Sequence, residues 1–429
     1  MKKFFALTVT LIIFLAVVFT LSGCDKEDNI LNDDTRKLVF KLNEDMSSYS
    51  LHKVKPLATD KAIVIPSEYL GLPVTRIGES AFYDCSNLLT IEIPDSVAVI
   101  DESAFSGCKN LLSVKMGNKV KQIGSYAFSG CGKLVDITLP SKLEFIGIYA
   151  FKDCVALKSV VIPDSVTSIG DSAFYGCASL TSVTIPNSVT SIGYRAFYYC
   201  YRLTSITIPD SVTSIGSGAF EYCASLTSIT IPDSVTSIGD SAFYGCASLT
   251  SITVSIGNAN YHSAGNCLIE TYSKTLILGC QNSVIPSDGS VTSIGDSAFY
   301  GCASLTSIAI PDSVTSIGDS AFYGCASLTS ITIPNSVTAI GKSVFKYCAS
   351  LTSITIPDSV TSIGDSAFSG CKSLTIVYYY GTAAEWDEIS IEPYNTELTF
   401  AARYYYSETE STEDGNFWHY DSDGEIVVW

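Results

Sequence analysis

The sequence predicts a β-rich repeat solenoid in which each coil is one 23-residue repeat. The repeat is clearest over residues 162–184, which read IPDSVTSIGDSAFYGCASLTSVT. Two markers recur at this interval in twelve copies: a phenylalanine, as at Phe174, and a cysteine three residues later, as at Cys177. A single copy buries too few apolar side chains to offset the conformational entropy that its 23 residues lose. The copies must therefore stack on one another.

Within each repeat, apolar residues lie three or four apart, which imitates an amphipathic helix. Proline excludes that interpretation, because most repeats carry one, as at Pro163, and a proline inside a helix costs about 3 kcal/mol. The remaining residues are mainly Ser, Thr, Val and Ile, which favour strands. We expect a strand at Leu-Thr-Ser-Ile-Thr-Ile, a stop at the proline, a second extended piece at Val-Thr-Ser-Ile, and a tight helical or turn segment at Asp-Ser-Ala-Phe.

The N-terminal sequence predicts an export signal. Two lysines precede 19 uncharged residues, Phe4–Ser22, and small residues follow before Cys24. The ending Leu-Ser-Gly-Cys resembles the bacterial lipoprotein box, which implies that residues 1–23 are removed and that Cys24 is lipidated. An uncleaved membrane helix is the alternative, because 19 residues can span a bilayer.

Residues 24–35 are polar and acidic, as expected of a flexible tether. Together with the signal, this segment predicts an exported protein that a lipid anchors to the cell membrane and holds at the cell surface.

The repeats carry a family resemblance. The pattern C-x-x-L-x-x-[IV]-x-I-P-[DN]-x-V-x-x-I-G-x-x-A-F resembles the BspA-type leucine-rich repeats of bacterial surface proteins, from about Ile63 to Tyr380. The resemblance implies a leucine-rich-repeat right-handed superhelix, with a curved parallel sheet on its concave side and short helical or turn segments on its convex side. It also implies adhesion or partner binding, and it brings no catalytic residues with it.

Both ends of a solenoid need caps to cover their open strands. Alternation over residues 37–42 and 49–54 predicts a hairpin within an N-terminal cap and first coil at 36–80. The solenoid then occupies 81–376. Residues 377–429 are aromatic and β-prone, which suits a C-terminal cap with short hairpins.

One interruption falls at about residues 255–290. The spacing from Phe243 to Phe299 is 56 residues, where 46 would keep the register. We interpret this stretch as a degenerate coil with a protruding hairpin formed by residues 267–270 and 275–278. Its Cys267 and Cys280 either form a disulfide or remain two free thiols. Both alternatives stay open, because the sequence does not give the distance between the two residues.

The twelve repeat cysteines are single residues 23 apart, not the close pairs that metal sites use. Each takes an apolar place between Phe and Leu, so we expect buried free thiols that pack as small hydrophobes.

Serine and threonine flank the inward Ile or Val of each expected strand, so alternation places them together on one exposed face. This face is the candidate binding face for a protein or glycan; its alternative is a solvated β-surface. Its members are Ser182, Thr184, Ser205, Thr207, Ser228, Thr230, Ser251, Thr253, Ser330, Thr332, Ser353 and Thr355.

Composition restricts the function further. A formal charge of −18 argues against a nucleic-acid partner, which needs a basic surface. Three scattered histidines, with no catalytic grouping, phosphate loop or zinc signature, predict no enzyme activity, metal or cofactor. We therefore expect a monomeric surface protein that binds macromolecules of a host, matrix or neighbouring cell. A structural scaffold of the cell envelope is the alternative, and an enzyme hidden in 377–429 is a further one.

Overall fold

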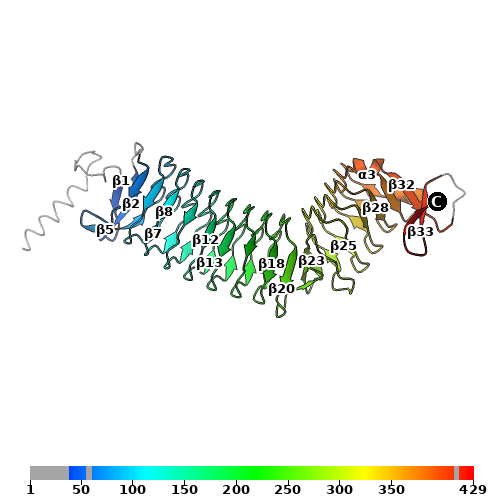
Figure 1. Cartoon of the computed structure of the whole chain (residues 1–429), viewed down its shortest axis with the longest axis horizontal. Coiled ribbons are helices and arrows are strands. Elements are labelled where there is room, and N and C mark those ends of the chain that lie inside the picture. Colours follow the sequence, from blue (N-terminus) through cyan, green and yellow to red (C-terminus); the bar gives the residue numbers. More distant parts are fainter. Residues whose placement is uncertain (1–37, 55–59, 410–414) are drawn as a thin grey trace, which may run out of the picture.

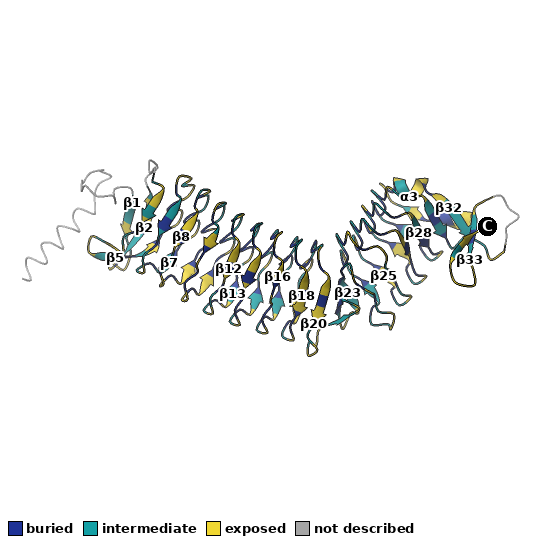
Figure 2. Cartoon of the chain, in the orientation of Figure 1, coloured by how far each residue is buried: buried dark blue, intermediate teal, exposed yellow. Residues whose placement is uncertain are grey.

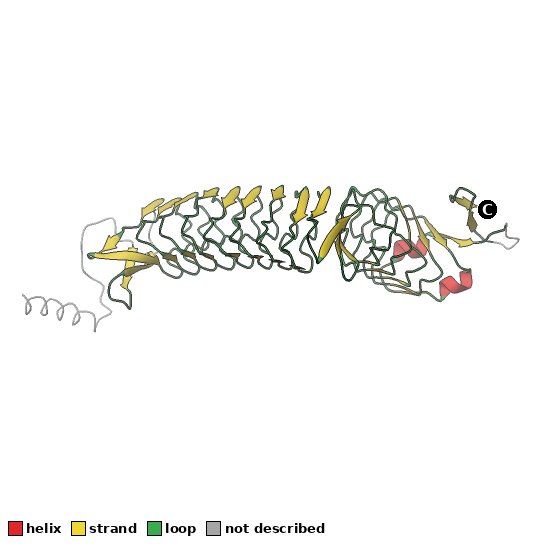
Figure 3. Ribbon diagram, turned by 90° about the horizontal axis from the view of Figure 1, so that it is seen from below, coloured by secondary structure: helices red, strands yellow, loops and turns green. Residues whose placement is uncertain are grey.

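The computed structural model describes residues 38–54, 60–409 and 415–429, which form one elongated, curved solenoid (Figure 1). Most repeats contribute two short strands, and turns and loops make up the rest of the coil (Figure 3). Strands of successive coils pair in parallel, as between Ser182 and Ser205, which are one repeat apart. The expected β-rich repeat solenoid is confirmed, and the Asp-Ser-Ala-Phe segments are turns.

The first strand of each repeat builds a row that we call the Ser-x-Thr ladder. Before the interruption its strands are β3 (Ala62–Val64), β6 (Thr90–Glu92), β8 (Ser113–Lys115), β10 (Asp136–Ile137), β12 (Ser159–Val161), β14 (Ser182–Thr184), β16 (Ser205–Ile206), β18 (Ser228–Ile231) and β20 (Ser251–Val254). After it they are β26 (Ser330–Thr332), β28 (Ser353–Ile356), β30 (Ile376–Tyr379) and β32 (Ala402–Tyr406).

The second strand of each repeat builds the Ser-Ile ladder. Its strands are β5 (Leu72–Ile77), β7 (Val99–Ile100), β9 (Gln122–Ile123), β11 (Phe145–Ile146), β13 (Ser168–Ile169), β15 (Ser191–Ile192), β17 (Ser214–Ile215) and β19 (Ser237–Ile238), then β24 (Ser293–Ile294), β25 (Ser316–Ile317), β27 (Ala339–Ile340), β29 (Ser362–Ile363) and β31 (Ser390–Ile391). The two ladders enclose the buried side chains, so exposed and buried residues alternate along the strands (Figure 2).

Phenylalanine rings form the centre of the core. Successive rings stack with centroids 4.8–5.5 Å apart from Phe82 to Phe243, and 5.1–5.6 Å apart from Phe299 to Phe368. The buried apolar residues form two clusters that meet at the interruption. The core is therefore divided where the repeat period breaks.

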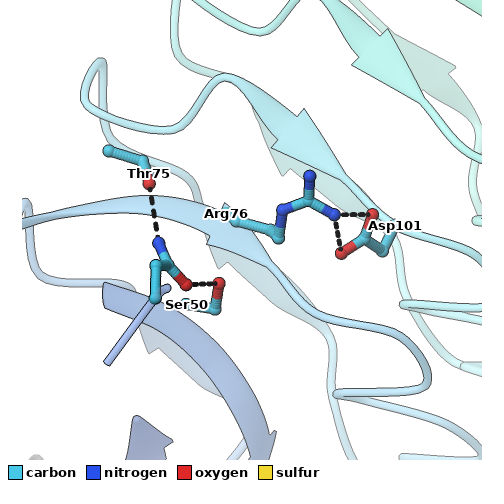
Figure 4. A network of polar contacts seen from close by, with 5 residues as sticks. Ser50, Thr75, Arg76 and Asp101 are labelled. Carbon is cyan, nitrogen blue, oxygen red and sulfur yellow. Dashed lines mark hydrogen bonds and ion pairs between the residues drawn. The ribbon is translucent and has the colours of Figure 1, made fainter. Parts of the chain in front are cut away.

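The N-terminal cap is a hairpin of β1 (Leu38–Leu42) and β2 (Tyr49–Val54), with β4 (Glu68–Tyr69) beside β5. Strand β2 pairs in parallel with β5, which begins the Ser-Ile ladder. Polar contacts fasten the cap: the Asn43 side chain donates to the Thr75 hydroxyl at 3.3 Å, and Arg76 pairs with Asp101 of the next coil at 2.6 Å (Figure 4).

The interruption folds into β21 (Tyr261–Ala264), β22 (Cys267–Glu270) and β23 (Thr275–Leu278), an antiparallel meander. The expected hairpin of β22 and β23 is present, but its expected protrusion is wrong. Within this hairpin, residues 267–269 are completely buried, and the exposed residues are those of the turn at 271–274. The reason is that β23 pairs in parallel with β24, so the hairpin replaces a coil instead of leaving the solenoid.

The C-terminal cap contains two short helices, α2 (Ala383–Asp387) and α3 (Thr396–Phe400), which the β-prone interpretation of 377–429 missed (Figure 3). Helix α2 begins with a capping box, because the Thr382 hydroxyl accepts from the Glu385 N–H and the Glu385 carboxylate accepts from the Thr382 N–H. The expected hairpin is there too, formed by β33 (Phe417–Tyr420) and β34 (Ile426–Val428).

Candidate binding face

The Ser-x-Thr ladder has the alternation that exposes hydroxyl side chains on one surface. In β14, Ser182 and Thr184 are exposed whereas Val183 between them is 7% exposed. The parallel register places Ser182 beside Ser205 and Ser228 beside Ser251. Of the twelve predicted residues, ten are exposed: Ser182, Thr184, Ser205, Thr207, Ser228, Thr230, Ser251, Thr253, Ser330 and Thr332.

Two of the twelve depart from the expectation. Ser353 is half-buried and Thr355 is only 3% exposed. Thr355 lies beside Tyr378 of β30 in the ladder, and the Tyr378 ring packs on Trp418 of the C-terminal cap. The aromatic cap therefore covers the last coil of the face.

The exposed hydroxyls are largely free of internal partners. Within the described residues, Thr230 and Thr253 bond to each other at 2.9 Å, and Thr253 also approaches the Ile229 carbonyl at 3.4 Å. The other eight exposed members have no hydrogen bond through their side chains in the part of the chain that the structure describes. These hydroxyls offer both donors and acceptors to a ligand.

The threonine just before each strand has a different role. Thr204 donates its hydroxyl to the Thr181 carbonyl at 3.3 Å, and Thr227 donates to Thr204 at 3.2 Å. This row joins each coil to the one before it. Sequence alone does not distinguish it from the free row, because both consist of threonine and serine at neighbouring positions of the repeat.

Charge divides the face along its length. At the N-terminal end, Lys115 pairs with Glu92, and Asp136 follows in the next strand. Val161 is then 65% exposed, a position in the threonine row that the sequence interpretation did not single out. From Ser182 to Thr253 the exposed ladder positions are neutral hydroxyls, so the middle of the solenoid offers a long uncharged polar surface.

The repeat thiols have little chemistry to offer. All fourteen cysteines of the described residues are free, and the repeat cysteines are buried apart from the first, Cys85. Burial raises the pKa of Cys154 and of Cys348 to about 12, so almost no thiolate forms at neutral pH. Cys267 and Cys280 are both free and buried, which agrees with the free-thiol alternative.

The thiols do make one polar contact that sequence reasoning missed. In ten coils the Sγ donates to the carbonyl of the phenylalanine 26 residues earlier, as from Cys177 to Phe151 at 3.2 Å. Each thiol thus bridges two coils as well as filling space.

Aspartate side chains accept hydrogen bonds from turns of the next coil. The Asp171 carboxylate accepts the N–H of Tyr194 in the next coil at 2.8 Å, and Asp296 accepts that of Asp319 in the same way. Among the described residues, no three His, Cys, Asp or Glu side chains are placed to hold a metal ion.

Cys24 and the rest of the expected signal and tether lie outside the described residues. None of the helices within 38–54, 60–409 and 415–429 has the length and apolar character to cross a membrane.

Repeated two-strand coils with leucine at a fixed core position, as at Leu180 and Leu203, define a leucine-rich-repeat solenoid. The chain belongs to the BspA-type leucine-rich repeat family, whose model, in six copies, matches residues 62–178, 144–270 and 269–390.

Two solved structures are similar to most of the chain. A leucine-rich cell surface protein from Faecalibacterium prausnitzii is 31% identical, with 86% of this chain and 99% of that chain covered and a TM-score of 0.60. A leucine-rich repeat protein from Bacteroides ovatus is 30% identical, with 88% and 100% covered and a TM-score of 0.58. No curated protein matches the sequence.

Proposed function

We propose that the protein is a non-enzymatic surface protein whose Ser-x-Thr ladder binds a protein or glycan of a host, matrix or neighbouring cell. The observation that carries this proposal is the row of exposed hydroxyls, most of them without a partner among the described residues, repeated in register along the solenoid. Repetition favours a ligand with repeated groups, because many weak contacts then act together.

The chemistry of the described thiols and metal-ligating side chains supports the proposal that the protein is not an enzyme. Burial raises the pKa of thiols such as Cys154 and Cys348, and the described residues bring no metal-ligand cluster together. The acidic charge of −18 disfavours nucleic acid as the ligand.

Surface location is part of the same proposal. The lipoprotein box at Cys24 supports a lipid anchor, and the similar Faecalibacterium prausnitzii protein is described as a cell surface protein. Labelling of cells with radioactive palmitate, comparing the native chain with Cys24→Ala, tests the anchor. Label on the native chain alone is expected; equal label on both would remove Cys24 as the attachment point.

Binding is tested by retention of the full-length chain on arrays of matrix proteins, mucins and glycans. The variant Ser205→Glu/Ser228→Glu places two negative charges on the Ser-x-Thr ladder, and Ser214→Glu/Ser237→Glu places the same charges on the Ser-Ile ladder. We expect the first variant to lose retention and the second to keep it. Equal retention of both would assign binding to another surface, and self-association without any ligand would favour an envelope scaffold.

A further inference from the structure

The coil that carries the interruption is shortened at one place. Other repeats have a seven-residue turn before the cysteine, such as Gly-Asp-Ser-Ala-Phe-Tyr-Gly at 170–176, whereas β23 is followed by Gly279 and Cys280. Gly279 stands where a phenylalanine would be, because its N–H donates to the Ala298 carbonyl at 2.8 Å, as the Phe174 N–H does to Ala196. One phenylalanine side chain and its turn are therefore missing from the stack.

A cleft of about 340 Å³ occupies this place. Its walls are the turns at 239–244 and 295–297, and Leu268 and Leu278 line it between them. The neighbouring coils touch where the Tyr244 and Tyr300 rings stack at 3.8 Å. Neighbouring phenylalanine rings of the core stack on a ring of the following coil. Among the described residues, no such ring stacks on Phe243.

The first wall keeps hydrogen-bonding groups that every intact coil uses. In the turn at 171–176, alternate N–H groups donate to carbonyls of the next coil at 2.7–2.9 Å. The corresponding N–H groups of Ser241, Phe243 and Gly245 have no partner in the described part of the chain. Within the described residues, the Asp240 carboxylate likewise accepts no next-coil N–H of the kind that Asp171 accepts from Tyr194.

These groups define the chemistry of an occupant. Alternate unpaired N–H groups are the pattern that an added peptide segment pairs with through its carbonyls. Leu268, Leu278 and Phe243 are buried apolar residues that suit an aromatic ring. Asp240 and Asp296 are exposed at the cleft, so a cation is favoured beside that ring.

We propose that this cleft binds a peptide segment in which an aromatic residue lies close to a basic residue. The ring packs on the apolar lining, peptide carbonyls accept from the N–H groups of Ser241 and Phe243, and the basic side chain lies near Asp240 and Asp296. The site is separate from the Ser-x-Thr ladder, so it does not depend on the function proposed above.

The probe is the blocked hexapeptide acetyl-Lys-Ser-Ala-Phe-Tyr-Gly-amide, titrated calorimetrically into the full-length chain in a non-ionic detergent. Replacing its Phe with Ala is expected to weaken binding at least about tenfold, because ring burial is lost. Replacing its Lys with Glu is expected to weaken binding about fivefold or more at low salt, and less at high salt.

Protein variants locate the site. Ile277→Trp and Thr275→Trp fill the cleft from two lining positions and are expected to abolish binding, whereas Val254→Trp, on β20 outside the cleft, leaves it unchanged. Circular dichroism melting identifies any variant that fails to fold. If one of the two filling variants does not fold, the other still tests the proposal. Absence of binding by the native chain, or unchanged binding after filling, would overturn the proposal. The variant Ser205→Glu/Ser228→Glu is expected to keep peptide binding. This result would show that the cleft and the Ser-x-Thr ladder are separate sites.

Discussion

Cys177 donates its thiol to the carbonyl of Phe151, 3.2 Å away in the preceding coil, although that carbonyl already accepts the N–H of Cys154. The same thiol–carbonyl pair recurs along the stack. The cysteines that repeat every 23 residues in the sequence therefore also form a row of hydrogen bonds between coils.

Replacing Cys177 with Ala is expected to destabilise the protein by about 1–2 kcal/mol, because it removes a buried sulfur atom and an inter-coil bond. Thermal melting followed by circular dichroism measures the loss. Cys85→Ala is the matched control, because Cys85 is only partly buried and its thiol makes no such bond among the described residues. Equal losses in the two variants would show that the bond contributes nothing.

Stability is expected to fall as the pH rises above about 9. Burial raises the pKa of Cys154 and Cys348 to about 12 from an ordinary value of 9.0, so the folded state holds protons that the unfolded state releases. The stabilisation is complete below pH 9 and is lost between pH 9 and 12. Melting temperatures measured from pH 7 to 11 under reducing conditions test this slope.

Cys154→Ala provides the control for the pH series, since its melting temperature should decline less steeply than that of the native chain. A melting temperature that does not change between pH 8 and 11 would contradict the expectation.

Ser320→Gly is expected to stabilise the solenoid by about 0.5–1 kcal/mol. Ser320 has a φ of 58°, a left-handed conformation that glycine adopts without the steric cost of a Cβ. Ser327→Gly, in the same coil but with an ordinary φ, should instead be destabilising by a similar amount. Melting temperatures of the two variants should therefore move in opposite directions.

Asn266→Ala is expected to cost about 1–3 kcal/mol, because its side chain completes the edge of β20. Its Oδ1 accepts the Ile252 N–H at 2.7 Å and its Nδ2 donates to the Thr250 carbonyl at 2.8 Å, as the strand of a further coil would. Hydrogen exchange of the Ile252 amide should accelerate in this variant. Asn260→Ala, an exposed residue in the same insertion, should change neither quantity.

The period of the sequence was sufficient to predict the fold and the register. Ser182 and Ser205 are one repeat apart, so stacking of identical coils must place them side by side. The alternation of Ser182, Val183 and Thr184 likewise predicted which side chains reach solvent.

Features that depend on contacts across the repeat were not predictable in this way. Burial of Thr355 follows from aromatic residues of the cap that pack beside it, and the thiol bond to Phe151 requires the offset between coils. Helix α2 is different, because Thr382 and Glu385 form a capping box that is visible in the sequence. It was missed because the aromatic residues around it favour strands.

The split of the hydrophobic core at the interruption has a consequence for cooperativity. In a stacked array, unfolding spreads from coil to coil through their shared interfaces. Among the described residues, the Phe243 and Phe299 coils lack the phenylalanine stacking and the turn hydrogen bonds that join other coils, although Tyr244 and Tyr300 stack between them. We therefore expect this interface to be the weakest in the array. The two halves are therefore expected to unfold as separate cooperative blocks, so that one half can unfold while the other stays folded.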